Sequence, residues 1–403
     1  MFIGPFAFYP KGTVIVRVLP LAKALKEHGY EVVVLLPPYD APQYSSVYFE
    51  ADGVLFYNVP IPRSRLPLKY LYVAACLVKR ALEFKPDVVH VFKPKGYSGL
   101  AGMLLVVLKF LRFTKVRLVV DTDDWEGHGG FADFFLEHDL YPRVMVDFFD
   151  FQERWLLRRT DAVTVASKTL EFRARKLRGN SGRGKVFYVP NGPSDFPVAS
   201  GGKSPFEVRK SLGIASSRVI LLYTRFFEYA VEEVIEILEH VVAELRDVKL
   251  LVVGKGDFGE EEELLKSAKE RDLLEHIVYV GWVKHEDVPS YVEAADVAIY
   301  PFRDDLLNRS KCPGKLIQLL SSGKAVVADS VGQISEYIEH GRSGILVEPG
   351  DVEQFAKWVV KLLKNRKLRE RLGENAKRKM WGLFSWEQLA NTVALAYELV
   401  LRC

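Results

Sequence analysis

The sequence predicts an α/β protein built from two Rossmann-like domains in tandem, and three features indicate this. The chain has 403 residues, which is too long for one hydrophobic core and fits two domains of about 200 residues each. Apolar strand-like segments alternate with helical segments from the first residue onward, as in parallel sheets covered by helices. The segment 191–205 holds three prolines and three glycines with few large apolar groups, which is typical of an interdomain linker.

The first half begins with a strand that ends near Tyr9, followed by a helix from PKGT (10–13) through about His28 and a stop at Gly29. This first βα turn lacks the GxGxxG fingerprint, so binding of a nicotinamide or flavin dinucleotide loses its main sequence support. Further strands are expected near 31–36, 54–59, 87–92, 116–121, 161–166 and 185–190, with helices near 71–84, 96–112 and 143–159.

The second half repeats this alternation. Strands are expected near 218–223, 248–253, 277–281, 296–300, 325–328 and 344–347. The last helix, 385–401, carries an apolar stripe from Trp386 to Val400 that needs another surface to cover it. We therefore expect one domain of residues 1–195, to which a helix of 383–403 returns, and a second domain of residues 205–382.

The segment 308–329, NRSKCPGKLIQLLSSGKAVVAD, connects a loop, a helix and a buried strand. Pro313 suits the first position of a helix, and Gly323 ends that helix. The loop before it therefore meets a helix N-terminus, which in an open α/β sheet favours anions. Lys311 and Lys315 add positive charge there. The alternative is a solvated basic helix start.

Composition narrows the classes of function. The net charge of +4 is spread along the chain, with no block of like charge longer than Glu260–Glu263, so nucleic acid is not an expected partner. Cys76, Cys312 and Cys403 share no close spacing, which excludes a CxxC metal site and fits a reducing cytoplasm. The first residues lack the basic start of a signal peptide.

Two segments bear on membranes. The apolar run LAGMLLVVL at 100–108 is too short to span a bilayer, which takes about 20 residues. The segment 62–70, PRSRLPLKY, combines three basic side chains with leucine and tyrosine, which suits contact with anionic headgroups. A solvated loop with snorkelling basic residues is the alternative. We expect a cytoplasmic protein that is soluble or attached to the inner face of the membrane.

An acidic segment, DTDDWEGHGG at 121–130, follows the strand near 116–121. The carboxyl ends of parallel strands are where such sheets bind ligands. Four acidic groups in six residues exceed what loop capping needs, so we expect Asp123 and Asp124 to have a function.

Several short sequence motifs follow one another in the second half: RVILLYTR, LLVVGKG, VGWV, AADVAIYP, GKAVVA and GRSGILVEP. Together with KGTVIVRVLPLAKALKEHGYEVVVL in the first half and NG at 191–192, they resemble family 4 of the retaining glycosyltransferases with the GT-B fold. The resemblance covers nearly the whole chain. It implies a nucleotide-sugar donor bound by the second domain and a carbohydrate or lipid-linked acceptor bound by the first, but it does not name the nucleotide, sugar or acceptor.

The resemblance also implies donor-binding residues. The family's diphosphate-binding arginine falls on Arg225, its partner lysine falls on Ala230 and is missing, and its pair of glutamates falls on Ser310 and Gln318. Gln318 can still hydrogen-bond ribose hydroxyls. A branch of the family with an asparagine and two lysines in this region is similar to the pattern of Asn308, Lys311 and Lys315.

We therefore expect Arg225, Lys311 and Lys315 to bind the donor diphosphate together with the helix start at Gly314 and Leu316. Gly12 falls on the tight loop whose backbone approaches the phosphates. Asp123 or Asp124 falls on the family's histidine or aspartate, and we expect these two residues to orient the acceptor or accept its proton.

Three other hypotheses remain open. The replaced glutamates and the missing lysine are compatible with a noncatalytic sugar-nucleotide binder or a silent subunit of a glycosyltransferase. An Asp-Thr-Asp site at 121–123 on Mg²⁺ or Mn²⁺ would make a metal-dependent enzyme. An epimerase or phosphorylase on the same two-domain plan is the third. The family resemblance favours transfer with retained anomeric configuration and without a metal or other cofactor.

Overall fold

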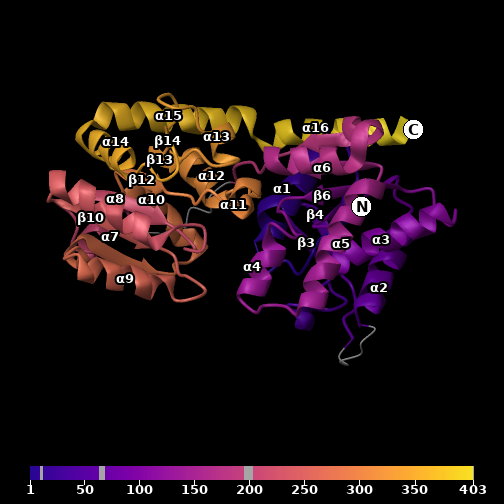
Figure 1. Cartoon of the computed structure of the whole chain (residues 1–403). Helices are drawn as coiled ribbons and strands as arrows, with labels where there is room; N and C mark the ends of the chain where they lie inside the picture. Colours follow the sequence, from indigo (N-terminus) through magenta and orange to yellow (C-terminus); the bar gives the residue numbers. More distant parts are fainter. Residues whose placement is uncertain (10–11, 63–68, 195–202, 403) are drawn as a thin grey trace. The chain divides into compact units, whose positions relative to one another are not determined.

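The structure, a computed structural model, describes residues 1–9, 12–62, 69–194 and 203–402 (Figure 1). The chain folds into two compact units. The first unit contains Met1–Gly192, Ser310–Cys312 and Phe384–Cys403, and the second contains Pro193–Arg309 and Pro313–Leu383. Each unit is an α/β structure around one largely parallel sheet, as the alternation in the sequence predicted.

The sheet of the first unit has eight strands in the order β3-β4-β2-β1-β5-β6-β7-β8. The strands are β1 (Phe2–Ile3), β2 (Val33–Leu36), β3 (Tyr48–Ala51), β4 (Val54–Asn58), β5 (Val88–Phe92), β6 (Arg117–Thr122), β7 (Ala162–Val165) and β8 (Val186–Tyr188). Only the edge pair β3–β4 is antiparallel among these strand pairs. β3 was not predicted from the sequence.

Helices cover both faces of this sheet. They are the π-helix η1 (Val14–Val18), α1 (Leu19–Glu27), the 3-10 helix η2 (Pro42–Tyr44), α2 (Lys69–Glu83), α3 (Gly96–Phe110), α4 (Phe131–Glu137), α5 (Arg143–Arg159), α6 (Lys168–Gly182), the 3-10 helix η3 (Arg183–Lys185) and α16 (Trp386–Arg402). The stripe of α16 is buried: Trp386, Leu389 and Val393 share one core cluster with Leu21 and Leu25 of α1. On the opposite face of the sheet, residues of α2, α3 and α5 form a second core cluster.

The second unit has a parallel six-stranded sheet in the order β11-β10-β9-β12-β13-β14. The strands are β9 (Arg218–Tyr223), β10 (Val248–Val253), β11 (Ile277–Gly281), β12 (Val297–Tyr300), β13 (Val326–Asp329) and β14 (Ile345–Val347). The helices are α7 (Pro205–Ser211), α8 (Val231–Glu244), α9 (Glu260–Glu270), η4 (Leu274–His276), η5 (His285–Asp287), α10 (Val288–Ala294), α11 (Leu306–Ser310), α12 (Gly314–Ser321), α13 (Ile334–Tyr337), α14 (Val352–Lys364) and α15 (Arg366–Leu383).

The start of α12 differs by one residue from the expectation. Pro313 is the N-cap, with ψ of 100°, and the helix begins at Gly314. An N-cap residue adopts an extended backbone while its carbonyl accepts the first helical bond, and the Ile317 N–H donates to the Pro313 carbonyl at 3.2 Å. Gly323, with φ of +82°, ends the helix as predicted.

Among the described residues, no helix combines the length and the apolar character needed to cross a membrane.

Candidate functional site

The end of β6 in the first unit is held by a buried ion pair. Arg17 of η1 donates from Nε and Nη2 to the two carboxylate oxygens of Asp121, at 2.7 and 2.6 Å, and both side chains are excluded from solvent. Thr164 of β7 donates to the same carboxylate at 2.5 Å. A buried bidentate pair uses the whole carboxylate. The structure therefore does not support the Asp-Thr-Asp metal site, because Asp121 is already occupied.

Three further acids of the β6–α4 loop surround one buried lysine. Lys93 Nζ lies 3.0 Å from Asp123 Oδ1, 2.5 Å from Asp124 Oδ2 and 3.1 Å from Glu126 Oε1. Lys95 also pairs with Glu126. Lys93 follows β5 directly, and its φ of +59° is unusual for a residue other than glycine. Ion pairs to Lys93 and Lys95, in the loop after the neighbouring strand β5, therefore hold the acidic loop after β6 in place.

This arrangement separates the proton affinities of the two predicted acceptor-side acids. Burial raises the pKa of Asp123 to about 6, although Lys93 opposes the rise. For Asp124 burial acts in the same direction, but the charge and hydrogen bond of Lys93 outweigh it and lower the pKa below its usual value. Asp124 therefore stays ionised near neutral pH, whereas Asp123 titrates in a range suited to accepting and releasing a proton.

The carboxylates of Asp123, Asp124 and Glu126 each offer an oxygen within 4.8 Å of the others, a spacing that a divalent cation can bridge. The Lys93 ammonium contacts all three carboxylates. Lys93 thus supplies the positive charge that a metal would otherwise bring to these acids.

Basic groups gather at the end of β9 in the second unit. The Lys315 Nζ lies 4.7 Å from the centroid of the Tyr223 ring, and Tyr223 is the last residue of β9. Burial raises the pKa of Tyr223 to about 12, and the charge of Arg225 opposes this rise. Burial and the charge of Lys315 lower the pKa of His285. The charges of Arg225 and Lys315 therefore both lie near Tyr223, and their role in binding the donor stays a prediction.

The first turn of α12 offers a ligand both backbone N–H groups and polar side chains. A side chain at Gly314 would meet open space, so an external group can approach the backbone there. Lys315 and Gln318 are three residues apart, which places them on one face of the helix, and both are half-buried. The Leu316 side chain is fully buried, so Leu316 has only its backbone N–H to offer a ligand. First-turn N–H groups lack acceptors within their helix.

The remaining predicted residues lie elsewhere. Asn308 is buried, and its Nδ2 donates to the carbonyls of Glu228 and Arg303 at 3.1 and 3.0 Å, so its amide holds a loop in place. Lys311 belongs to the first unit, where its Nζ lies 5.7 Å from the centroid of Phe131. The structure therefore does not bring Lys311 together with Arg225 and Lys315 in one unit.

Gly12 lies two residues before Val14, the first residue of η1, and its carbonyl accepts from the Val16 N–H at 2.9 Å. A side chain at Gly12 would meet open space. Its backbone is thus accessible at the beginning of a helical segment of the first unit.

Comparison with known proteins connects both units to one activity. Residues 206–379 match the family described as glycosyl transferases group 1, and residues 12–192 match the glycosyl transferase 4-like domain. An uncharacterized glycosyltransferase of Methanocaldococcus jannaschii is 23% identical over 412 residues, which cover 99% of this chain and 95% of the relative. The N-acetyl-alpha-D-glucosaminyl L-malate synthase of Bacillus anthracis is 28% identical over 199 residues, 49% of each chain.

Solved structures agree on the fold. Anabaena HepE, in complex with UDP and glucose, aligns with a TM-score of 0.71 at 17% identity over 99% of both chains. Sucrose-phosphate synthase from Thermosynechococcus elongatus aligns with a TM-score of 0.69 at 18% identity over 100% of this chain and 99% of the other. The two family matches together span most of the sequence, with only residues 193–205 between them, and the chain therefore belongs to the group 1 glycosyltransferases of the GT-B fold.

Proposed function

We propose that the protein is a retaining glycosyltransferase that moves a sugar from a nucleoside diphosphate donor to a hydroxyl group of a carbohydrate or lipid-linked acceptor. The observation that supports the donor site is that Lys315, in the first turn of α12, lies over the ring of Tyr223 at the end of β9, and that the charge of Arg225 acts on the same tyrosine. HepE, which shares the fold, binds UDP and glucose.

In this proposal the second unit holds the leaving group. The Arg225 guanidinium provides a planar fork of donors, Lys315 provides an adaptable point charge, and the first-turn N–H groups of α12 add hydrogen bonds. Negative charge grows on the diphosphate as the bond to the sugar breaks. Fixed positive groups aimed at that charge lower the barrier without any rearrangement during the reaction. Gly12 and Lys311, the two predicted donor-binding residues of the first unit, stay part of this proposal.

The first unit prepares the acceptor. Asp123, with its pKa near 6, accepts the proton of the attacking hydroxyl, and ionised Asp124 orients that hydroxyl. Attack on the face from which the diphosphate departs retains the anomeric configuration. Such a step needs no side-chain nucleophile, and positioning supplies much of the rate.

A noncatalytic sugar-nucleotide binder is the second candidate. It is favoured by Ala230, Ser310 and Gln318, which stand where the family resemblance predicts a lysine and two glutamates. Such a protein would bind the donor but would neither transfer nor hydrolyse it.

Thermal shift with UDP, GDP, ADP and their glucose and mannose conjugates identifies the nucleotide, because a ligand at 100 times its Kd adds about 2.7 kcal/mol of stability. Water then serves as a surrogate acceptor: proton NMR of the slow hydrolysis of the bound donor records the first anomer released. We expect the anomer of the donor. The opposite anomer contradicts retention, and binding without any turnover supports the noncatalytic candidate.

A further inference from the structure

The side of α3 that faces away from the core is apolar but exposed to solvent. Residues 100–108 are all apolar or glycine, so this part of the helix is apolar on every side. Helices of this kind are normally buried on all sides. Near its C-terminal end the solvent-exposed fractions are nevertheless 45% for Val107, 84% for Phe110, 53% for Leu111 and 76% for Phe113. Large apolar groups this exposed and this close together indicate an interaction surface.

The outer side of α5 continues this pattern. Phe148 and Phe151 are exposed, and their rings stack at a centroid distance of 6.5 Å. Trp155 follows one turn later on the same side and is half-buried. Residues at these spacings form one stripe along a helix, so an aromatic stripe of α5 faces solvent.

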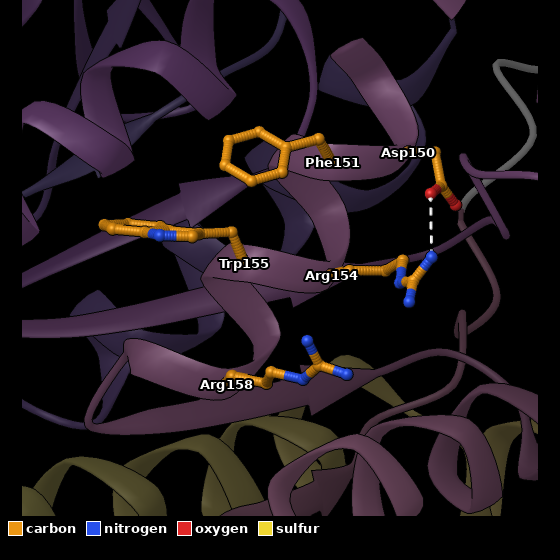
Figure 2. A pocket seen from close by; sticks show the side chains of 5 residues that line it. All are labelled: Asp150, Phe151, Arg154, Trp155 and Arg158. Carbon is orange, nitrogen blue, oxygen red and sulfur yellow. Dashed lines mark hydrogen bonds and ion pairs between the residues drawn. The ribbon is translucent and has the colours of Figure 1, made fainter. Parts of the chain in front are cut away.

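Arginines accompany the stripe. Phe151, Trp155, Arg154 and Arg158 line a pocket of about 230 Å³ together with Asp150 (Figure 2). Figure 2 shows the two rings on one side and the two guanidinium groups on successive turns of α5. Arg154 donates to Asp150 at 3.3 Å, whereas Arg158 forms no ion pair or hydrogen bond with any residue in the described ranges. The pocket thus offers one unpaired cation beside aromatic faces.

The helices α3 and α5 pack against each other. α3 and α5 share the core cluster through Leu105 and Leu156, and Lys109 near the end of α3 pairs at 2.5 Å with Asp161, just beyond the end of α5. The exposed groups at the end of α3 therefore lie beside the last turns of α5. We define the α3–α5 surface by the residues Val107, Phe110, Leu111, Arg112, Phe113, Phe148, Phe151, Arg154, Trp155, Arg158 and Arg159.

We propose that the α3–α5 surface docks onto an anionic lipid bilayer. The phenylalanine and leucine side chains enter the boundary between headgroups and acyl chains, where the tryptophan ring also resides. The arginines bind the headgroup phosphates, and each basic residue close to an anionic surface adds to the attraction. Aromatic groups bordered by arginines match such a surface in both polarity and charge.

The α3–α5 surface shares no residue with the predicted donor site or with the segment predicted to touch headgroups. Of that segment, 62–70, residues 63–68 lie outside the described residues. The proposal therefore stands on α3 and α5 alone, and it holds whichever sugar the enzyme transfers.

Co-sedimentation of the full chain with phosphatidylcholine vesicles, with and without phosphatidylglycerol, tests the proposal. We expect binding to the anionic vesicles that weakens as salt is added. The double variant Phe110→Ser/Phe113→Ser should lower the partition coefficient by at least about tenfold, because two apolar rings no longer enter the bilayer. Arg158→Glu, which reverses one charge, should lower it by about fivefold or more.

The matched control is Phe206→Ser, because Phe206 is 67% exposed on α7 of the second unit. It should leave vesicle binding unchanged, and all variants should keep the thermal unfolding midpoint of the wild type. Absence of binding to anionic vesicles overturns the proposal, as does an equal loss in the control. A concentration-dependent dimer that disappears in Phe110→Ser/Phe113→Ser would assign the surface to a second copy of the chain and would also overturn it.

Discussion

Replacement of Lys93 by methionine tests the electrostatic framework of the candidate acceptor site. The substitution keeps the length of the side chain but removes the ammonium group that contacts Asp123, Asp124 and Glu126. The Lys93 side chain is 7% exposed and that of Glu126 is 0% exposed, so solvent cannot replace the lost charge. Removal of one partner from a buried ion pair costs about 3–5 kcal/mol.

The loss should depend on pH. Without Lys93 the clustered carboxylates repel one another, so their pKa values in the folded state rise above those in the unfolded state. A carboxyl group with a raised pKa stabilises the fold below its unfolded pKa and loses that contribution as the pH rises through the folded value. The variant should therefore be destabilised more at pH 8 than at pH 5, relative to the wild type.

Urea unfolding at both pH values measures this as a shift in the midpoint of the first unit's transition. Lys109→Met is the matched control, because Lys109 and Asp161 form a partly exposed pair with 28% and 21% side-chain exposure, which is worth about 1 kcal/mol or less. An equal loss in both variants, or a loss in Lys93→Met that is the same at pH 5 and pH 8, would refute the reasoning.

Three further predictions concern the chemistry and stability of the two units. Asp123→Ala and Asp124→Ala should each lower kcat with little change in the Kd of the nucleotide, and the wild-type kcat/KM should fall below about pH 6, where Asp123 becomes protonated; calorimetry that shows a large loss of nucleotide binding would remove both residues from the acceptor side. Activity should persist in EDTA because Lys93 supplies the charge among the acids, whereas complete loss with recovery in Mn²⁺ would place a metal at Asp123, Asp124 and Glu126. Burial raises the pKa of Asp329 to about 8, so the unfolding free energy should fall between about pH 4 and pH 8 by up to about 1.4 kcal/mol per pH unit, and urea titrations of Asp329→Asn should lack this slope.

The sequence predicted most of the buried parallel strands because they are largely apolar runs, as in 218–223, which can be recognised without knowledge of their neighbours. The first strand, expected to end near Tyr9, covers only Phe2–Ile3. The sequence did not predict β3. That strand consists of only four residues, Tyr48–Ala51, at the edge of the sheet, and side chains that alternate between exposed and half-buried give a weak apolar signal.

The residues of the candidate site could be predicted only in part, because some signals are local in the sequence and others depend on distant residues. Arg225 and Lys315 were predicted as donor-binding residues from the family resemblance and from helix chemistry, which are local signals, and this role stays a prediction. Arg17 and Lys93 were missed because their partners lie far along the chain: Arg17 pairs with Asp121, 104 residues away. A charged residue within the apolar segment VIVRV, and two lysines directly after β5, were the signals available. Only the order β5-β6 of neighbouring strands brings Lys93 to the acids after β6.

The most direct test of the proposed function is calorimetric titration of the nucleoside diphosphates UDP, GDP and ADP into the wild type, Arg225→Ala, Lys315→Ala and the control Lys284→Ala, whose side chain is exposed in the second unit. For the diphosphate that binds the wild type, loss of one charge-assisted contact should cost about 1.5–3 kcal/mol, or roughly 10–150-fold in Kd, in each of the first two variants. The control should bind as the wild type does. Unchanged affinity in both Arg225→Ala and Lys315→Ala, or no binding of any of the three diphosphates to the wild type, would contradict the proposed donor site.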